Sequence, residues 1–254
     1  MLIPETPNVS LVAFYYRKPQ ELTELIQKIQ AHLINIFPQQ FTPYELEQVH
    51  STVIGCEGVT TEAGIINRWY FQHQSQTKYM NFDRFLDYLN RNKYLPTTIR
   101  FGGYDRNQNY NFLSRGQHPY IRSFQLQAAA DNTWIPVLIG WSVEDNFITN
   151  RIDNLRRDAQ QFNLLHKYHA TSEAIDNDFY LRLGTIQGEL TTEKTDEIAT
   201  YVRNLLEKQS SVNITLDLDN LAFVKYQDLS LPLATTEILP LNAATPSKIK
   251  KLFD

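Results

Sequence analysis

The sequence predicts an α/β fold in which two similar lobes face each other across a central cleft. β-rich runs alternate with segments whose apolar residues recur every three or four positions, the period of an amphipathic helix. The same order of strands and helices occurs twice, once in each half of the 254-residue chain. Two β-α-β-α-β units related by pseudo-symmetry would each cover one sheet face with helices and turn the other face to the cleft.

The first half predicts strand, helix, strand, helix and strand, in that order. Segment 22–36 carries leucine and isoleucine at helical spacing, and segment 82–89 repeats this pattern with phenylalanine and leucine. The flanking runs are rich in β-branched and aromatic residues, which favour strands. The expected strands are 11–16, 48–55 and 98–101.

The second half predicts the same order. A strand at 137–141 precedes a helix from about residue 149 to 165, and a strand at 179–184 follows. A second helix begins after Thr191, whose side-chain oxygen can accept a hydrogen bond from an unpaired amide of the first turn. The last strand of this unit is 212–216.

The chain is long enough to bury a large core, and no Pro/Gly/Ser-rich linker divides it. We therefore expect residues 1–130 to form the first lobe and residues 131–254 the second, within one cooperative domain. The least regular region, 106–119, is expected to be a long loop near the junction of the lobes.

Composition narrows the classes of function. The single cysteine, Cys56, excludes an internal disulfide, no run approaches membrane-spanning length, and the first residues do not form a secretory signal, so a soluble cytoplasmic protein is expected. The net charge of −4 argues against extended coating of nucleic acid. A small nucleotide or a single RNA end remains possible, because a cleft needs only a few local cations.

Two short segments carry the residues most suited to chemistry. In an extended strand, side chains alternate between faces, so His50 and Thr52 share one surface. The corresponding positions of the second unit hold Tyr180 and Arg182. Ordinary packing of a strand histidine and a cross-strand tyrosine is the alternative explanation for His50 and Tyr180.

The order of elements and the segment His50-Ser51-Thr52-Val53 resemble the 2H phosphoesterase superfamily, which includes RNA 2′,3′-cyclic phosphodiesterases and ligase-like proteins with two lobes. Members of that family carry two His-x-Thr/Ser motifs on facing strands. Here the second motif is altered, since Tyr180 and Arg182 replace its histidine and hydroxyl residue. The resemblance implies a metal-independent phosphodiesterase site without a cofactor, acting on a phosphorylated nucleotide or RNA end.

The altered motif predicts a cleft that recognises phosphate but lacks one of the two catalytic imidazoles. Imidazoles suit both the acid and the base of cyclic-phosphate opening near neutral pH. Tyr180 is a poor base with an ordinary pKa near 10, although it can donate a hydrogen bond. Arg182 is permanently cationic, and its planar guanidinium group can donate two hydrogen bonds to a phosphate. A non-catalytic module that binds a ligand or another protein is therefore the main alternative.

Further substrate-binding candidates come from the cationic side chains and from a glycine turn. Arg100, Arg115 and Arg122 could contribute positive charge to the cleft, and solvated surface arginines are the alternative. Tyr104 follows Gly102-Gly103, where the chain can turn tightly or approach a ligand closely.

His166 and His169 support two other hypotheses. If a helix continued through them, they would share one face and could bind a metal with a carboxylate, which would make the protein a metal-dependent hydrolase. Alternatively, because residues 176–178 lead directly to Tyr180, the preceding segment that carries the two histidines could fold back beside the cleft. Either histidine could then replace the missing acid–base group.

Overall fold

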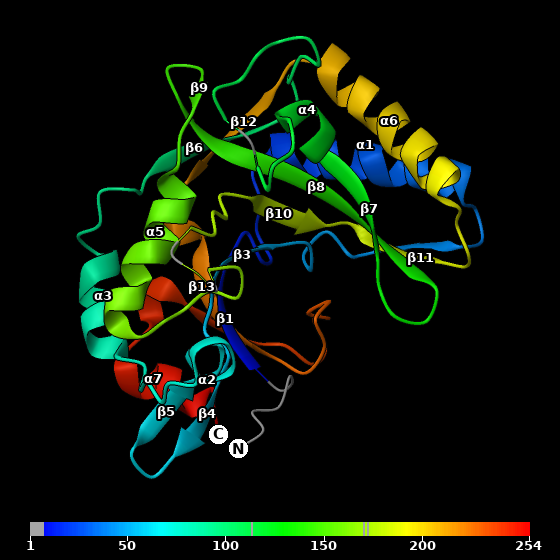
Figure 1. The fold of residues 1–254 in the computed structure, drawn as a ribbon. Helices are drawn as coiled ribbons and strands as arrows, with labels where there is room; N and C mark the ends of the chain where they lie inside the picture. Colours follow the sequence, from blue (N-terminus) through cyan, green and yellow to red (C-terminus); the bar gives the residue numbers. More distant parts are fainter. Residues whose placement is uncertain (1–7, 113, 170, 172) are drawn as a thin grey trace.

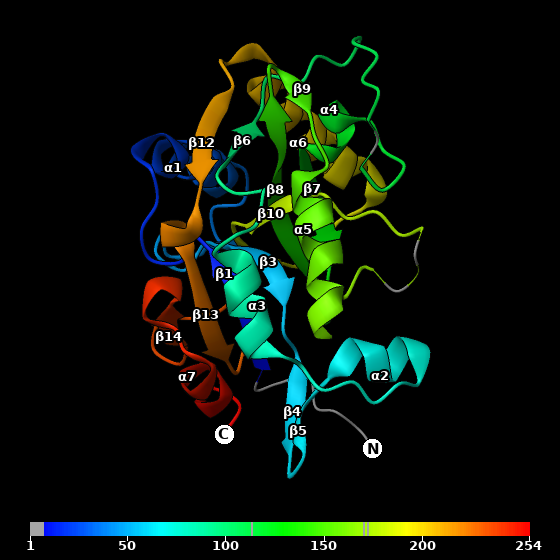
Figure 2. The same cartoon turned by 90° about the vertical axis from the view of Figure 1, so that its left-hand side faces the viewer.

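The computed structural model describes residues 8–112, 114–169, 171 and 173–254, and it confirms a mixed α/β fold (Figures 1 and 2). One sheet has the strand order β14-β13-β1-β3, with all neighbours antiparallel. Its strands are β1 (Asn8–Ala13), β3 (Ser51–Gly55), β13 (Leu221–Tyr226) and β14 (Glu237–Pro240).

The other large sheet has the order β12-β6-β8-β11-β2, and three further strands pair with the long central β8. Strands β4 (Gly58–Thr61) and β5 (Gly64–Asn67) form a separate hairpin. The strands of the large sheet are β2 (Phe41–Pro43), β6 (Thr97–Phe101), β7 (Phe124–Ala128), β8 (Thr133–Glu144), β9 (Phe147–Ile148), β10 (Phe179–Arg182), β11 (Gly184–Gln187) and β12 (Val212–Leu216).

The two sheets do not divide the chain at its midpoint. Strands β2 and β6 come from the first half, yet they pair with strands of the second half, β11 in one case and β8 and β12 in the other. Conversely, β13 comes from the C-terminal part and pairs with β1. Each half of the sequence therefore contributes to both sheets.

Helices α1 (Gln20–Ile36), α3 (Phe82–Leu89) and α6 (Thr192–Lys208) begin and end close to the residues that periodicity indicated. Helix α1 buries the apolar stripe that includes Leu22, Ile29 and Leu33, and the Thr191 hydroxyl accepts a hydrogen bond from the Lys194 amide at the start of α6. Helix α1 packs against β2 and β12, α6 against β7, and α5 against β3 and β8. The helices are α1 (Gln20–Ile36), α2 (Arg68–Gln74), α3 (Phe82–Leu89), α4 (Pro119–Arg122), α5 (Arg151–Ala159), α6 (Thr192–Lys208) and α7 (Pro246–Lys251), and 3₁₀ turns cover Gln160–Phe162, Leu218–Asn220 and Leu241–Ala243.

Some boundaries differ from the sequence prediction for local reasons. The first strand ends at Ala13 rather than at residue 16, because Phe14 and Tyr16 have positive φ angles of 58° and 72° that turn the chain. The helix expected to reach residue 165 ends as an α-helix at Ala159. After the following 3₁₀ turn, Asn163 takes the left-handed conformation and redirects the chain.

One continuous core passes between the two large sheets. The Phe179 ring of β10 lies 5.9 Å from the Phe14 ring and 6.0 Å from the Phe101 ring, measured between centroids, and all three side chains are almost fully buried. Full burial of one such side chain contributes roughly 1.5–3 kcal/mol. This shared core brings β3 beside β10. Within the described residues, no helix is long and apolar enough to cross a membrane.

Candidate functional site

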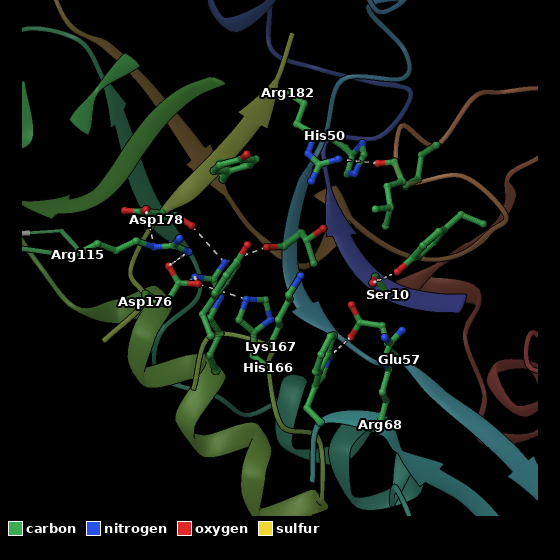
Figure 3. Close-up of a pocket in the computed structure, with 18 residues that line it drawn as sticks. Ser10, His50, Glu57, Arg68, Arg115, His166, Lys167, Asp176, Asp178 and Arg182 are labelled. Atoms are coloured by element: carbon green, nitrogen blue, oxygen red, sulfur yellow. Dashed lines mark hydrogen bonds and ion pairs between the residues drawn. The ribbon is translucent and has the colours of Figure 1, made fainter. Parts of the chain in front are cut away.

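A cavity of about 200 Å³ lies where the edge of β3 meets β10, and it gathers most of the residues singled out from the sequence (Figure 3). The two strands are joined by a hydrogen bond of 3.1 Å from the Tyr180 amide to Ser51 Oγ. Six of the predicted residues line this one cavity: His50, Thr52, Arg115, His166, Tyr180 and Arg182.

Arg156 of α5 bridges the two strand edges. Its guanidinium donates to the carbonyl oxygens of Thr52 and Val53, at 2.9 and 2.8 Å, on the β3 side. It also donates to the carbonyls of Asp176 and Asp178, at 2.8 and 3.2 Å, just before β10. Edge carbonyls that are buried need hydrogen-bond donors. A single side chain therefore supplies the donors that a neighbouring strand would otherwise provide.

His50 is held as a neutral imidazole with one nitrogen available. Its Nδ1 lies 2.8 Å from the Gln48 carbonyl oxygen, so this nitrogen carries the proton and Nε2 keeps its lone pair. Burial lowers the pKa of His50 to about 4, helped by the positive charges of Arg182 and Lys18 and opposed by the bond to Gln48. At neutral pH the side chain can accept a proton.

The altered second motif places an aromatic hydroxyl and a cation in the same cavity. The Tyr180 hydroxyl donates to Gln127 Oε1 at 2.7 Å, and burial raises the pKa of Tyr180 above its ordinary value, so the phenol stays protonated. Arg182 makes a long hydrogen bond of 3.4 Å to the Leu229 carbonyl oxygen. A ligand anion can displace such a weak partner because it offers a charge-assisted bond.

Buried aspartates beside the cavity are neutralised by arginines. Asp178 accepts from Arg122 Nη2 at 2.7 Å, from Trp141 Nε1 at 2.9 Å and from the Ser114 hydroxyl. Arg115 lies 3.4 Å from Asp176 and 3.6 Å from Asp178, measured from guanidinium nitrogen to carboxylate oxygen. Arg122, a candidate ligand-binding cation in the sequence, is instead committed to this network.

His166 does fold back to the cavity, but both of its ring nitrogens are occupied. Nδ1 accepts a hydrogen bond of 3.1 Å from the Gly55 amide, and Nε2 lies 3.3 Å from Asp176 Oδ2. The proton is therefore on Nε2 and is donated to the carboxylate. Burial lowers the pKa of His166 to about 4, so at pH 7 a neutral imidazole donates this hydrogen bond to the charged carboxylate. In this arrangement His166 positions its neighbours and has no free lone pair for proton transfer.

His169, Arg100 and Tyr104 do not line the cavity. His169 is fully buried and its Nε2 lies 2.7 Å from Asp153 Oδ1, away from the Asp176 partner of His166. Arg100 turns to the β8–β9 hairpin, where it donates to Asn146 Oδ1 at 3.0 Å. Tyr104 is a core residue whose ring packs 4.9 Å from the Trp141 ring, so a ligand cannot reach it. Within the described residues, no group of three or more His, Cys, Asp or Glu side chains is arranged to hold a metal ion.

Several cavity residues were not identified as functional from the sequence. For the segment with Arg68 and Trp69, the sequence favours core packing over stacking on a base, whereas α2 presents both side chains to the cavity. Glu57 folds against Gly55, which has no side chain to obstruct it, and accepts a hydrogen bond of 2.8 Å from Trp69 Nε1. Burial raises the pKa of Glu57. Lys167 could have been found from the sequence, because it stands directly beside His166 in the segment expected to approach the cleft.

The buried histidine predicts a loss of stability in mild acid. The pKa of His166 is about 4 in the folded protein and 6.5 in the unfolded chain, so the unfolded state binds more protons between these values. Its contribution is fully present above pH 6.5 and falls as the pH approaches 4, by roughly 3 kcal/mol in total. Urea unfolding at a series of pH values should show this decline, and it should be smaller in His166→Gln. Equal acid sensitivity of the two proteins would contradict this assignment.

The sequence matches no protein-family model and no curated protein. Among solved structures, its fold is similar to that of TT0787 of Thermus thermophilus, with a TM-score of 0.41 and 11% sequence identity. The match covers 94% of this chain and 100% of that chain. The resemblance to 2H phosphoesterases therefore rests on the sequence and stays a prediction.

Proposed function

We propose that this protein binds the phosphorylated end of a nucleotide or RNA, with the phosphate between His50 and Arg182, and that His50 allows it to open a cyclic phosphate. One observation carries the proposal: a neutral histidine and a permanent cation, from the facing edges of two sheets, line the same cavity. Thr52 lines it as well and offers a hydroxyl from the β3 side.

The proposed phosphate contacts follow from the chemistry of these groups. The Arg182 guanidinium can donate two parallel hydrogen bonds to phosphate oxygens, and the Thr52 hydroxyl can donate a third. The Nε2 lone pair of His50 can take a proton from a water that attacks phosphorus, and the ribose oxygen released when the ring P–O bond breaks takes a proton from solvent. Because the cavity volume of about 200 Å³ is below the roughly 300–1,000 Å³ of drug-sized sites, it suits the end of a ligand rather than a long segment.

The binding contact is tested by replacing Arg182 with alanine. Loss of a charge-assisted contact costs about 1.5–3 kcal/mol, so the dissociation constant for a nucleoside 3′-monophosphate should rise by roughly 10- to 100-fold. Calorimetric titration measures the change, and circular dichroism verifies folding. Arg91→Ala is the matched control, since Arg91 is an exposed arginine in the turn after α3 and does not line the cavity. Unchanged affinity in Arg182→Ala would remove this residue from the site.

A binding protein without turnover is the second candidate function, and a specific observation favours it. The Tyr180 hydroxyl is already donated to Gln127, and both nitrogens of His166 are engaged. Among the described residues that line the cavity, His50 is thus the sole imidazole with an unoccupied nitrogen. Tight binding of a cyclic phosphate that is recovered intact would support this function over hydrolysis.

A metal-dependent hydrolase built on His166 and His169 is less well supported. The two rings lie 6.0 Å apart between centroids, and each donates to a different aspartate. Both would have to break these buried bonds to share one ion. Activity that disappears with a chelator and returns with a divalent cation would restore this alternative.

A further inference from the structure

The end of the cavity opposite Arg182 carries a second cation suited to an anionic ligand. This end is formed by α2 and by the chain that follows the 3₁₀ turn at Gln160–Phe162, which contribute Trp69 and Lys167. Figure 3 shows Arg182 and Lys167 entering the cavity from opposite sides. The two cations belong to different elements, and only the tertiary fold brings them into the same cavity.

The two aspartates that line the cavity already have arginine partners. Asp176 lies 3.3 Å from Arg156, and Asp178 lies 2.7 Å from Arg122, which does not line the cavity, and 3.6 Å from Arg115. Glu57 lies in the field of Arg68 as well as that of Lys167. Among the described residues that line the cavity, five are cationic and three anionic, and the five cations are Arg68, Arg115, Arg156, Lys167 and Arg182. Cationic side chains thus outnumber acidic ones along the lining, which favours an anionic ligand.

Lys167 is held over aromatic rings rather than against a carboxylate. Its Nζ lies 5.5 Å from the Trp69 ring centroid and 5.7 Å from the Tyr168 ring centroid. Tyr168 is in turn fixed by Arg115, whose guanidinium carbon lies 3.9 Å from the same ring. Cation–π contacts orient an ammonium group and leave its N–H donors available. In the part of the chain that the structure describes, neither Lys167 nor Arg182 has a carboxylate within ion-pair distance.

We infer that Lys167 binds a second phosphate group, so that the ligand class is a nucleotide carrying two phosphates joined through a ribose, as at the end of an RNA chain. This inference rests on the proposed function, because it assigns the first phosphate to Arg182. Lys167 and Arg182 enter the cavity from opposite sides, so each can bind one phosphate group, and the exposed Tyr168 ring beside Lys167 can contact the ribose or base between them. A mononucleotide with one phosphate would give Lys167 no phosphate to bind.

Two simple probes test the second phosphate: adenosine 3′-monophosphate and adenosine 3′,5′-bisphosphate. In the wild-type protein the bisphosphate should bind at least about 10-fold more tightly, the size of one charge-assisted contact. In Lys167→Gln this advantage should disappear, while the affinity for the monophosphate stays within about 2-fold. Arg182→Ala should weaken both ligands. Lys251→Gln, which removes the same charge from an exposed position on α7, is the matched control.

The outcomes separate this inference from the proposed function. If the monophosphate binds through Arg182 but the bisphosphate is no tighter, the Lys167 inference is wrong and the proposed function stands. If the bisphosphate advantage persists in Lys167→Gln, another residue holds the second phosphate and the inference also fails. If neither nucleotide binds the wild-type protein, both proposals fail. Thermal unfolding of each variant shows whether a lost affinity reflects lost structure, and Lys167→Arg should retain the advantage because it keeps the charge.

Discussion

Replacing Arg156 with methionine should lower the free energy of unfolding by about 3–5 kcal/mol, the cost of breaking a buried ion pair from one side. The change leaves four carbonyl oxygens of the two strand edges without their donor and removes one cation from beside Asp176. The total stability of a domain is only about 5–15 kcal/mol, so this is a large fraction. Urea unfolding monitored by circular dichroism measures the effect.

Two further variants make the Arg156 experiment decisive. Arg156→Lys keeps the charge but cannot reach both strands with a planar fork, so its stability should fall between wild type and Arg156→Met. Arg157→Met is the neighbouring control, because Arg157 is more exposed and pairs with Asp153 rather than with the strand edges. If Arg156→Met unfolds within about 1 kcal/mol of wild type, Arg156 does not hold the two sheets together.

Replacing His50 with alanine should lower the rate of cyclic-phosphate opening by roughly 100- to 10,000-fold, the usual contribution of a general base. The variant should still bind phosphate through Arg182, so the effect should fall on turnover more than on affinity. Hydrolysis of a nucleoside 2′,3′-cyclic phosphate, followed in excess chelator, is the measurement. His32→Ala is a suitable control, because His32 lies on α1 against Tyr201 and does not line the cavity.

The pH profile supplies an independent test of the same residue. Since the pKa of His50 is lowered to about 4, the base is already deprotonated well below neutral pH. The acid limb of kcat/KM should therefore have its midpoint near 4 instead of near the ordinary histidine value of 6.5. A wild-type rate in folded His50→Ala would exclude His50 as the base. Binding without measurable turnover in the wild-type protein would favour the non-catalytic candidate function.

Local sequence patterns were enough to predict several helices and strands and the face that the cavity residues share. Helices α1 and α6 follow from the spacing of their apolar residues, and the start of α6 follows from Thr191, because these are interactions between residues a few positions apart. The alternation of side chains along a strand was likewise sufficient to predict that Tyr180 and Arg182 lie on the same face. The same two-residue spacing placed Thr52 with His50, although His50 itself lies just before β3.

The way these elements combine depends on long-range packing. The pairing of β6 with β8, and of β13 with β1, depends on contacts between residues far apart in sequence, and no local pattern specifies such partners. The roles of single polar residues depend on the same contacts. Arg156 has the sequence context of an ordinary helix arginine, yet it is buried because two strand edges present their carbonyls to it.

In the candidate site, too, the sequence indicated candidate residues, and packing decided which of them a ligand can reach. His166 was a possible acid–base group in the sequence, but the Gly55 amide and Asp176 occupy its two nitrogens, and Lys167 beside it is the cation that faces the cavity. Tyr104 was expected to be accessible after its glycine turn, but the Trp141 ring covers it. Residue type sets which hydrogen bonds and ion pairs a side chain can make. Three-dimensional packing sets which of these are already made within the protein. A ligand can bind only to the donors, acceptors and charges that are still available.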